Sequence, residues 1–265
     1  MSGGLVDSHC HLDYLEGERH GLCVDEVLAR AAAAGVGHML TVSVDRENMR
    51  RVLAHAARYP QVSASVGIHP GACASEEPVS EDELLRFASA PKVVAIGETG
   101  LDYHYGRDSA ERQRESFAVH LRAAARAGLP VIVHTREASE DTLRLMAEHA
   151  EPRHAGVMHC FTETLDVALA AIEMNFCISF SGIVSFRNAE SLREVVRRIP
   201  ADRLLVETDA PYLAPAPHRG RCNEPALVAR VAEVVAELRG IALQELAELS
   251  TANFRRLFPR AVLGA

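Results

Sequence analysis

Short apolar segments recur along the whole chain and alternate with longer segments of helical period. Each short segment is mostly β-branched, as expected of parallel strands that are covered on both faces. The chain between one segment and the next is long enough for a helix. We therefore predict eight buried strands at residues 5–8, 38–43, 63–68, 93–97, 131–134, 156–159, 177–181 and 204–207.

The intervening segments place apolar residues three and four positions apart, which is the period of an amphipathic helix. The first predicted helix, residues 25–34, stops at Gly35, a residue typical of helix C-termini. Ser80-Glu81-Asp82-Glu83 has the capping-box pattern that begins a helix. Further helices are predicted at residues 109–127, 165–174, 191–199, 225–238 and 243–257.

Regular strand–helix alternation without a linker predicts an α/β fold, specifically one (β/α)8 TIM barrel domain covering residues 1–265. The length of 265 residues suits such a barrel, which typically has about 250 residues. A doubly wound open sheet is the competing architecture. The first strand is not followed by the Gly-rich phosphate-binding sequence of that fold.

Composition narrows the classes of protein to consider. No stretch approaches the roughly 18 apolar residues of a membrane span, and the N-terminus lacks a secretory pattern, so we expect a cytoplasmic protein without a membrane partner. The six cysteines include no C-x-x-C pair, and we expect reduced thiols that pack rather than bind metal. A net charge of −8 argues against a broad basic surface for duplex DNA, but allows a small phosphate-binding pocket around metal ions.

Polar residues with ligand chemistry stand where the predicted strands end. His9 and His11 lie two apart and so point to the same side of an extended strand. Other strands end in carboxylates or histidines, and in a barrel all these ends converge on the C-terminal face, where active sites lie. The candidate metal ligands are His9, His11, Glu98, His134, His159 and Asp209.

This set of imidazoles and carboxylates suits Zn, Mn, Fe or Mg. Six ligands are too many for one open catalytic ion and suit two ions that share a bridging carboxylate, for which we choose Glu98. Two ions about 3.5–4 Å apart can clamp the attacking and leaving oxygens of a phosphoryl displacement. Asp209 could orient or deprotonate the attacking water. We assign His9, His11, Glu98 and Asp209 to one ion, and Glu98, His134 and His159 to the other.

Seven motifs in order make the chain similar to a known family: DSHCHLD at 7–13, GIHP at 67–70, GETGLDY at 97–103, PVIVH at 130–134, HCFT at 159–162, ETDAPYL at 207–213 and RGRCNEP at 219–225. The chain resembles the TatD family of metal-dependent deoxyribonucleases, within the wider amidohydrolase-like barrels. The resemblance implies hydrolysis of DNA phosphodiester bonds, in many members from the 3′ end. It supports the same six positions as ligands. We expect two divalent ions there, Mg, Mn or Zn, with Glu98 and Asp209 as the catalytic residues.

We expect single-stranded DNA ends as substrate, with RNA as an open alternative, and no obligate protein partner. The candidate substrate contacts are His69, Arg136, Arg219 and Arg221 for phosphate and Tyr103 for stacking on a base. A structural histidine and solvated loop arginines are the plainer interpretations of these residues.

The chain departs from the family pattern at two positions. Glu163 stands where Gly is usual, and Cys222 stands where Arg or Lys is common. We expect Glu163 to add a negative charge near the mouth of the barrel and to alter loop geometry or substrate choice. We expect Cys222 to remove one phosphate contact.

Two other functions compete with the nuclease. An amidase, lactonase or phosphotriesterase of the same superfamily commonly uses a carboxylated lysine on strand four as its bridge. Here Glu98 holds that place, and Lys92 begins the strand at its opposite end. The remaining alternative, a metal-binding scaffold without catalysis, is disfavoured because the ligand set is intact.

Overall fold

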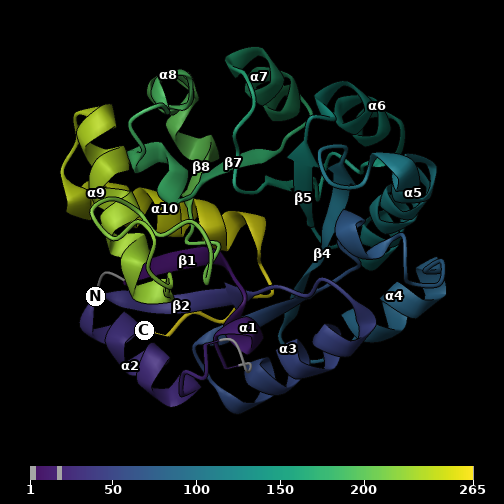
Figure 1. Cartoon of the computed structure of the whole chain (residues 1–265), viewed down its shortest axis with the longest axis horizontal. Coiled ribbons are helices and arrows are strands. Elements are labelled where there is room, and N and C mark those ends of the chain that lie inside the picture. The colour runs from purple at the N-terminus through teal and green to yellow at the C-terminus, as the bar shows by residue number, and fades with distance from the viewer. Residues whose placement is uncertain (1–3, 17–19, 265) are drawn as a thin grey trace.

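The computed structural model, which describes residues 4–16 and 20–264, contains eight parallel strands that pair in chain order and curve into a barrel (Figure 1). Helices on the connections surround the strands, so the predicted (β/α)8 barrel is confirmed. The strands are β1 (Leu5–Cys10), β2 (Val36–Thr41), β3 (Val62–Val66), β4 (Val93–Asp102), β5 (Val131–Arg136), β6 (Gly156–Met158), β7 (Cys177–Phe180) and β8 (Leu204–Val206).

The barrel closes between β1 and the chain that follows β8. Cys10 forms a parallel bridge with Ala210. The backbone N–H of Asp209 donates to the carbonyl of His9 at 2.9 Å, and the N–H of His11 donates to Ala210 at 2.8 Å. Backbone hydrogen bonds therefore join β1 to the segment that follows β8.

The outer layer consists of helices, some of which begin or end where the local sequence predicts. The Ser80 side chain caps the start of α4 (Glu81–Ala88) by accepting from the N–H of Glu83, and Gly128 ends α5 (Ala110–Ala127) in the left-handed conformation. The helices are α1 (Leu12–Glu16), α2 (Val24–Ala33), α3 (Arg46–Arg58), α4 (Glu81–Ala88), α5 (Ala110–Ala127), α6 (Ser139–His149), α7 (Leu165–Glu173), α8 (Glu190–Arg198), α9 (Val228–Arg239) and α10 (Leu243–Leu257). Within the described ranges, no helix is both long and apolar enough to cross a membrane.

The end of α10 closes the N-terminal end of the barrel. Phe254 and Phe258 are fully buried in one cluster with inward-facing strand residues such as Val6 and Leu205. Asn253 donates to the carbonyl of Leu204 at the start of β8. Each buried Phe contributes about 1.5–3 kcal/mol of transfer free energy, so this end is a packed core and the opposite end is left for chemistry.

Several elements differ from the prediction. Helices α1, α3 and α6 were not predicted, although α3 buries Met49, Val52 and Ala56 at helical spacing within a strongly charged segment. β4 is longer than predicted because it continues past Glu98 alongside β5, where Gly100 pairs with His134. A Cβ at Gly100 would lie 2.0 Å from the His134 carbonyl oxygen, so glycine permits this close approach.

Candidate metal centre

The six residues predicted as ligands converge on one point at the C-terminal face of the barrel. β1 carries His9 with His11 just beyond it, β4 carries Glu98, and β5 carries His134. His159 and Asp209 follow the ends of β6 and β8. Residues distant in sequence thus meet because parallel strands all end on the same face.

Glu98 lies at the centre of this cluster, and its two carboxylate oxygens face different groups. Oε2 is 3.4 Å from His9 Nε2 and 3.9 Å from His11 Nε2. Oε1 is 2.7 Å from His159 Nε2 and 3.2 Å from His134 Nδ1. One buried carboxylate therefore lies between two pairs of imidazoles, which is the arrangement of a bridging ligand.

The first group comprises His9, His11 and Asp209. Asp209 Oδ1 lies 3.7 Å from His9 Nε2 and 3.4 Å from His11 Nε2, and the three ligand atoms fall within 4.8 Å of one another. His11 Nδ1 donates to the carbonyl of Val42 at 3.2 Å. Because this bond keeps the proton on Nδ1, Nε2 carries a lone pair that faces Glu98 and Asp209.

The second group comprises His134 and His159, whose Nδ1 and Nε2 atoms are 3.3 Å apart. A carboxylate lies behind each ring: Asp102 Oδ2 is 3.3 Å from His134 Nε2, and Glu207 Oε1 is 3.4 Å from His159 Nδ1. Carboxylates behind metal-binding histidines fix the tautomer and the ring orientation. Asp102 also accepts from the N–H of Tyr105, which holds the loop after β4.

The sequence interpretation gave no role to two buried carboxylates. Glu207 accepts from the N–H of Cys160 at 2.7 Å while it faces His159. Asp7 accepts from both the N–H and the hydroxyl of Thr208, and burial raises its pKa to about 8. Both residues belong to matched motifs, two positions before a candidate ligand, and that spacing was the available signal.

Buried polar atoms left without partners test whether a cation fits here. His9 is fully buried, and its Nε2 has no hydrogen-bond partner among the described residues although it points at Glu98 and Asp209. Burying such an atom unpaired is costly. Nitrogen and oxygen donors around one centre would be satisfied by divalent cations, so the residues fit the predicted metals.

The electrostatics of the cluster favour a charged centre. Burial alone raises the pKa of Glu98, but the nearby imidazoles, His159 first, outweigh it and hold the pKa well below its usual value. Asp209 follows the same pattern through its contact with His11, and its pKa is also lowered. Burial lowers the pKa of His9, which keeps that imidazole neutral and able to act as a ligand.

His69 follows β3 and enters the cluster from its open side. Its Nδ1 accepts from the N–H of Gly71 at 2.9 Å, which places the proton on Nε2. Nε2 lies 3.4 Å from Glu98 Oε1, and burial lowers the pKa of His69 to about 4. His69 is thus a neutral imidazole that offers a hydrogen-bond donor to the centre.

The other predicted substrate contacts lie at strand ends or on loops of this face. The Tyr103 hydroxyl donates to Asp141 at 2.6 Å. The guanidinium of Arg136 lies over the exposed ring of Tyr105, 4.6 Å from its centroid. Arg219 lies 4.2 Å from the centroid of Phe186.

The remaining predicted positions are placed as follows. Arg221 and Cys222 are exposed on the loop after β8. Glu163 accepts from the hydroxyl of Ser139, and burial raises its pKa. Lys92 donates to the carbonyl of Tyr59 at 2.6 Å, at the opposite end of β4 from Glu98. A carboxylated lysine therefore cannot replace Glu98 as the bridge.

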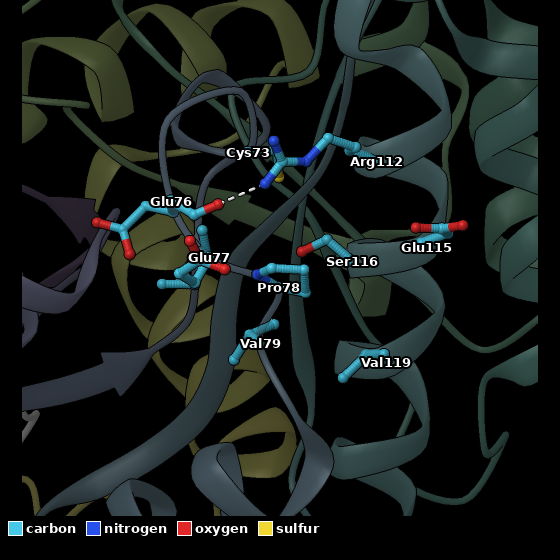
Figure 2. Close-up of a pocket in the computed structure, with 10 residues that line it drawn as sticks. Cys73, Glu76, Glu77, Pro78, Val79, Arg112, Glu115, Ser116 and Val119 are labelled. Atoms are coloured by element: carbon cyan, nitrogen blue, oxygen red, sulfur yellow. Dashed lines mark hydrogen bonds between the residues drawn. The ribbon is translucent and has the colours of Figure 1, made fainter.

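A cavity of about 180 Å³ lies away from the cluster, between the segment after β3 and helix α5 (Figure 2). Ile68, Val79 and Val119 form apolar parts of its wall, and Arg112 closes one side by donating to the carbonyl of Glu76. Neither Glu98 nor any of its histidine neighbours lines it. This cavity is therefore separate from the cluster, whose chemistry marks the functional site.

Comparison with known proteins agrees with the geometry. A family model described as TatD related DNase matches residues 6–259. The chain belongs to this family. The family model, the names of similar proteins and the clustered His, Glu and Asp residues together identify the chain as a metal-dependent hydrolase of the TatD family.

Similar proteins span nearly the whole chain. The uncharacterized metal-dependent hydrolase YcfH of Escherichia coli strain K12 is 48% identical over 254 residues, covering 96% of this chain and 95% of YcfH. The 3'-5' ssDNA/RNA exonuclease TatD of Salmonella typhimurium strain LT2 is 36% identical over 239 residues, covering 88% and 92%. The crystal structure of YJJV, a TatD homolog from Escherichia coli K12, superposes with a TM-score of 0.90 at 33% identity, covering 98% and 99%.

Proposed function

We propose that this TatD-family hydrolase uses two divalent ions to remove nucleotides from the 3′ ends of single-stranded DNA and single-stranded RNA. The observation that carries the proposal is the position of Glu98, whose two oxygens face separate pairs of histidines. The printed name of the Salmonella relative, an exonuclease on single-stranded DNA and RNA, supports the same substrate class.

In this proposal two sets of ligands would each hold one divalent ion, and Glu98 would belong to both sets. Bound there, divalent ions supply positive charge that stabilises a phosphorane-like transition state and lowers the pKa of water. Mg, Mn and Zn all suit the donor set. We assign one ion to His9, His11, Glu98 and Asp209, and the other to Glu98, His134 and His159.

The chain's own residues handle protons and hold the geometry. Asp209 is ionised, because its pKa is lowered, and its carboxylate can accept the proton of the attacking water. His69 Nε2–H can donate to a non-bridging phosphate oxygen from the open side. Asp102 and Glu207 keep the rings of His134 and His159 from turning.

The loops of the same face would hold the rest of the substrate. Arg136, Arg219 and Arg221 are exposed there and are our candidates for phosphate contacts beyond the cleaved bond. Tyr103 remains a candidate for contact with a base. An overall charge of −8 supports recognition of a chain end in a small site over binding of a long duplex.

The test is shortening of end-labelled single-stranded DNA by the purified protein with Mg, Mn or Zn. We expect shortening from the 3′ end that is lost in Glu98→Gln and in Asp209→Asn. Glu148→Gln, an exposed substitution on α6, is the matched control and should retain activity. Labelling each end in turn determines the direction of cleavage.

The same assay separates the competing functions. Wild-type protein that leaves DNA and RNA intact with every metal, yet hydrolyses small esters or amides, would overturn the nuclease proposal. Metal binding without hydrolysis of either class of compound would indicate a scaffold instead.

A further inference from the structure

Two tyrosines form a corner beside the first ligand group, next to His11. The ring of Tyr14, on α1, stacks against the His11 ring with centroids 5.3 Å apart and planes inclined by 26°. The Tyr212 ring lies 6.3 Å from His11 and 6.5 Å from Tyr14, at 77° to the Tyr14 plane. The three rings thus form two nearly perpendicular walls that meet at a candidate metal ligand.

This corner opens to solvent on the side of Tyr212. Tyr212 is 44% exposed, whereas His11 is only 3% exposed. The backbone of Tyr212 is held firmly: its N–H donates to the carbonyl of Asp209 at 2.9 Å, and its carbonyl accepts from Asn223 at 2.6 Å. An exposed aromatic ring on a fixed backbone, three residues from a ligand, can contact whatever enters the mouth.

We propose that Tyr14 and Tyr212 form a stacking subsite for the base of the terminal nucleotide, an inference that rests on the proposed nuclease function. Every nucleobase has a π-face, so stacking on tyrosine tolerates any sequence. A base against Tyr212 lies beside the ligand group of His11 and Asp209, and its sugar can then lead to a phosphate at Glu98. Such a base has left its duplex neighbours, which accounts for a preference for single-stranded ends.

Other aromatic residues of this face are less suited to the role. The Tyr103 hydroxyl is engaged with Asp141 and Arg114, and its ring packs against the hydrophobic core. The exposed ring of Tyr105 carries Arg136 over one face. Tyr212 instead contacts a ligand histidine directly, so a base placed against it is nearest to the reacting phosphate.

The test compares two single-stranded oligonucleotides that are identical except that one has an abasic 3′-terminal nucleotide. Losing one stacked base is expected to raise KM about 5- to 150-fold. Wild type should show this difference between the two oligonucleotides. Tyr212→Ala should raise KM by a similar factor on the intact end and leave the abasic end unchanged. Tyr212→Phe keeps the ring and should keep the KM difference between the intact and the abasic end.

The outcomes separate this inference from the function on which it rests. Wild type that shortens DNA, with Tyr212→Ala equally impaired on intact and abasic ends, overturns the stacking subsite alone. The same holds if wild type does not distinguish the two ends. Wild type that shortens neither oligonucleotide with Mg, Mn or Zn overturns the proposed function and the subsite with it. Manganese binding by Tyr212→Ala at wild-type affinity shows that any loss arises from the missing ring.

Discussion

Glu207→Gln tests whether the carboxylate behind His159 orients that histidine toward a metal ion. Glu207 is fully buried, and its Oε1 accepts from the N–H of Cys160 at 2.7 Å while lying 3.4 Å from His159 Nδ1. Glutamine has the same shape and retains a carbonyl oxygen for the Cys160 N–H. The substitution therefore removes the negative charge facing the imidazole and disturbs little else.

The expected effect is a 10- to 100-fold loss of affinity at one ion. This is the range for replacing a partner behind a metal-binding histidine, and it corresponds to about 1.4–2.8 kcal/mol. The ion bound by His134 and His159 should lose the most affinity, because Glu207 faces the His159 ring directly. Glu207→Ala should in addition lose about 1–3 kcal/mol of stability, since the part-buried Cys160 N–H loses its acceptor.

The assay is calorimetric titration of Mn²⁺ or Zn²⁺ into metal-free protein, with Glu148→Gln on the exposed face of α6 as control. Two binding steps are expected in wild type, with one of them weakened in Glu207→Gln. Wild-type affinity at both steps would refute the orienting role. Loss of one step altogether would instead identify Glu207 as a direct ligand, since its atoms also lie within 4.8 Å of those of His9 and His159.

Three further predictions follow from the same structure. Burial lowers the pKa of His38 and of His120 to about 4 in the folded protein. Below pH 6.5 the unfolded chain therefore binds more protons than the folded protein. The stability from each histidine is fully present above pH 6.5 and falls by about 3 kcal/mol toward pH 4. Urea unfolding of His120→Gln should show a weaker pH dependence than wild type, and an equal dependence would refute this. Gly100→Ala, whose Cβ would lie 2.0 Å from the His134 carbonyl oxygen at a φ of +134°, should cost about 2–5 kcal/mol in denaturant unfolding. Gly220→Ala, where a Cβ meets nothing within 4 Å, should cost less, and equal losses would contradict the steric argument. Divalent ions at 100 times their Kd should stabilise the fold by about 2.7 kcal/mol. A chelator should therefore lower the Tm of wild type more than the Tm of Glu98→Gln. Equal shifts in Tm would argue against metal binding at Glu98.

The sequence alone determined the barrel and the residues that gather at its mouth. Strand and helix periods are local properties, and eight alternations leave few other architectures. Once the barrel is predicted, its topology requires that residues at strand ends, such as His9 and Asp209, lie on one face. Convergence of the six candidate ligands therefore followed without any knowledge of side-chain positions.

The extent of some elements depended on neighbours that the local pattern does not show. β4 continues to Asp102 because β5 pairs alongside it, and Gly100 allows the two backbones to approach. α3 is helical although strongly charged, because Met49 and Val52 face the core. In both cases packing against another element decided the outcome, and local periodicity does not report that packing.

Roles that depend on contacts across the closed barrel were decided only by the tertiary structure. Glu207 is recognised by its contact with His159, 48 positions earlier in the chain, and Tyr14 meets Tyr212 only because β1 and β8 join. His69 is seen as a donor because Gly71 occupies its other nitrogen. A sequence can name the residue types at a strand end. Histidine tautomers, hydrogen-bond partners and ring orientations, however, are set by which atoms the closed barrel brings within reach of one another.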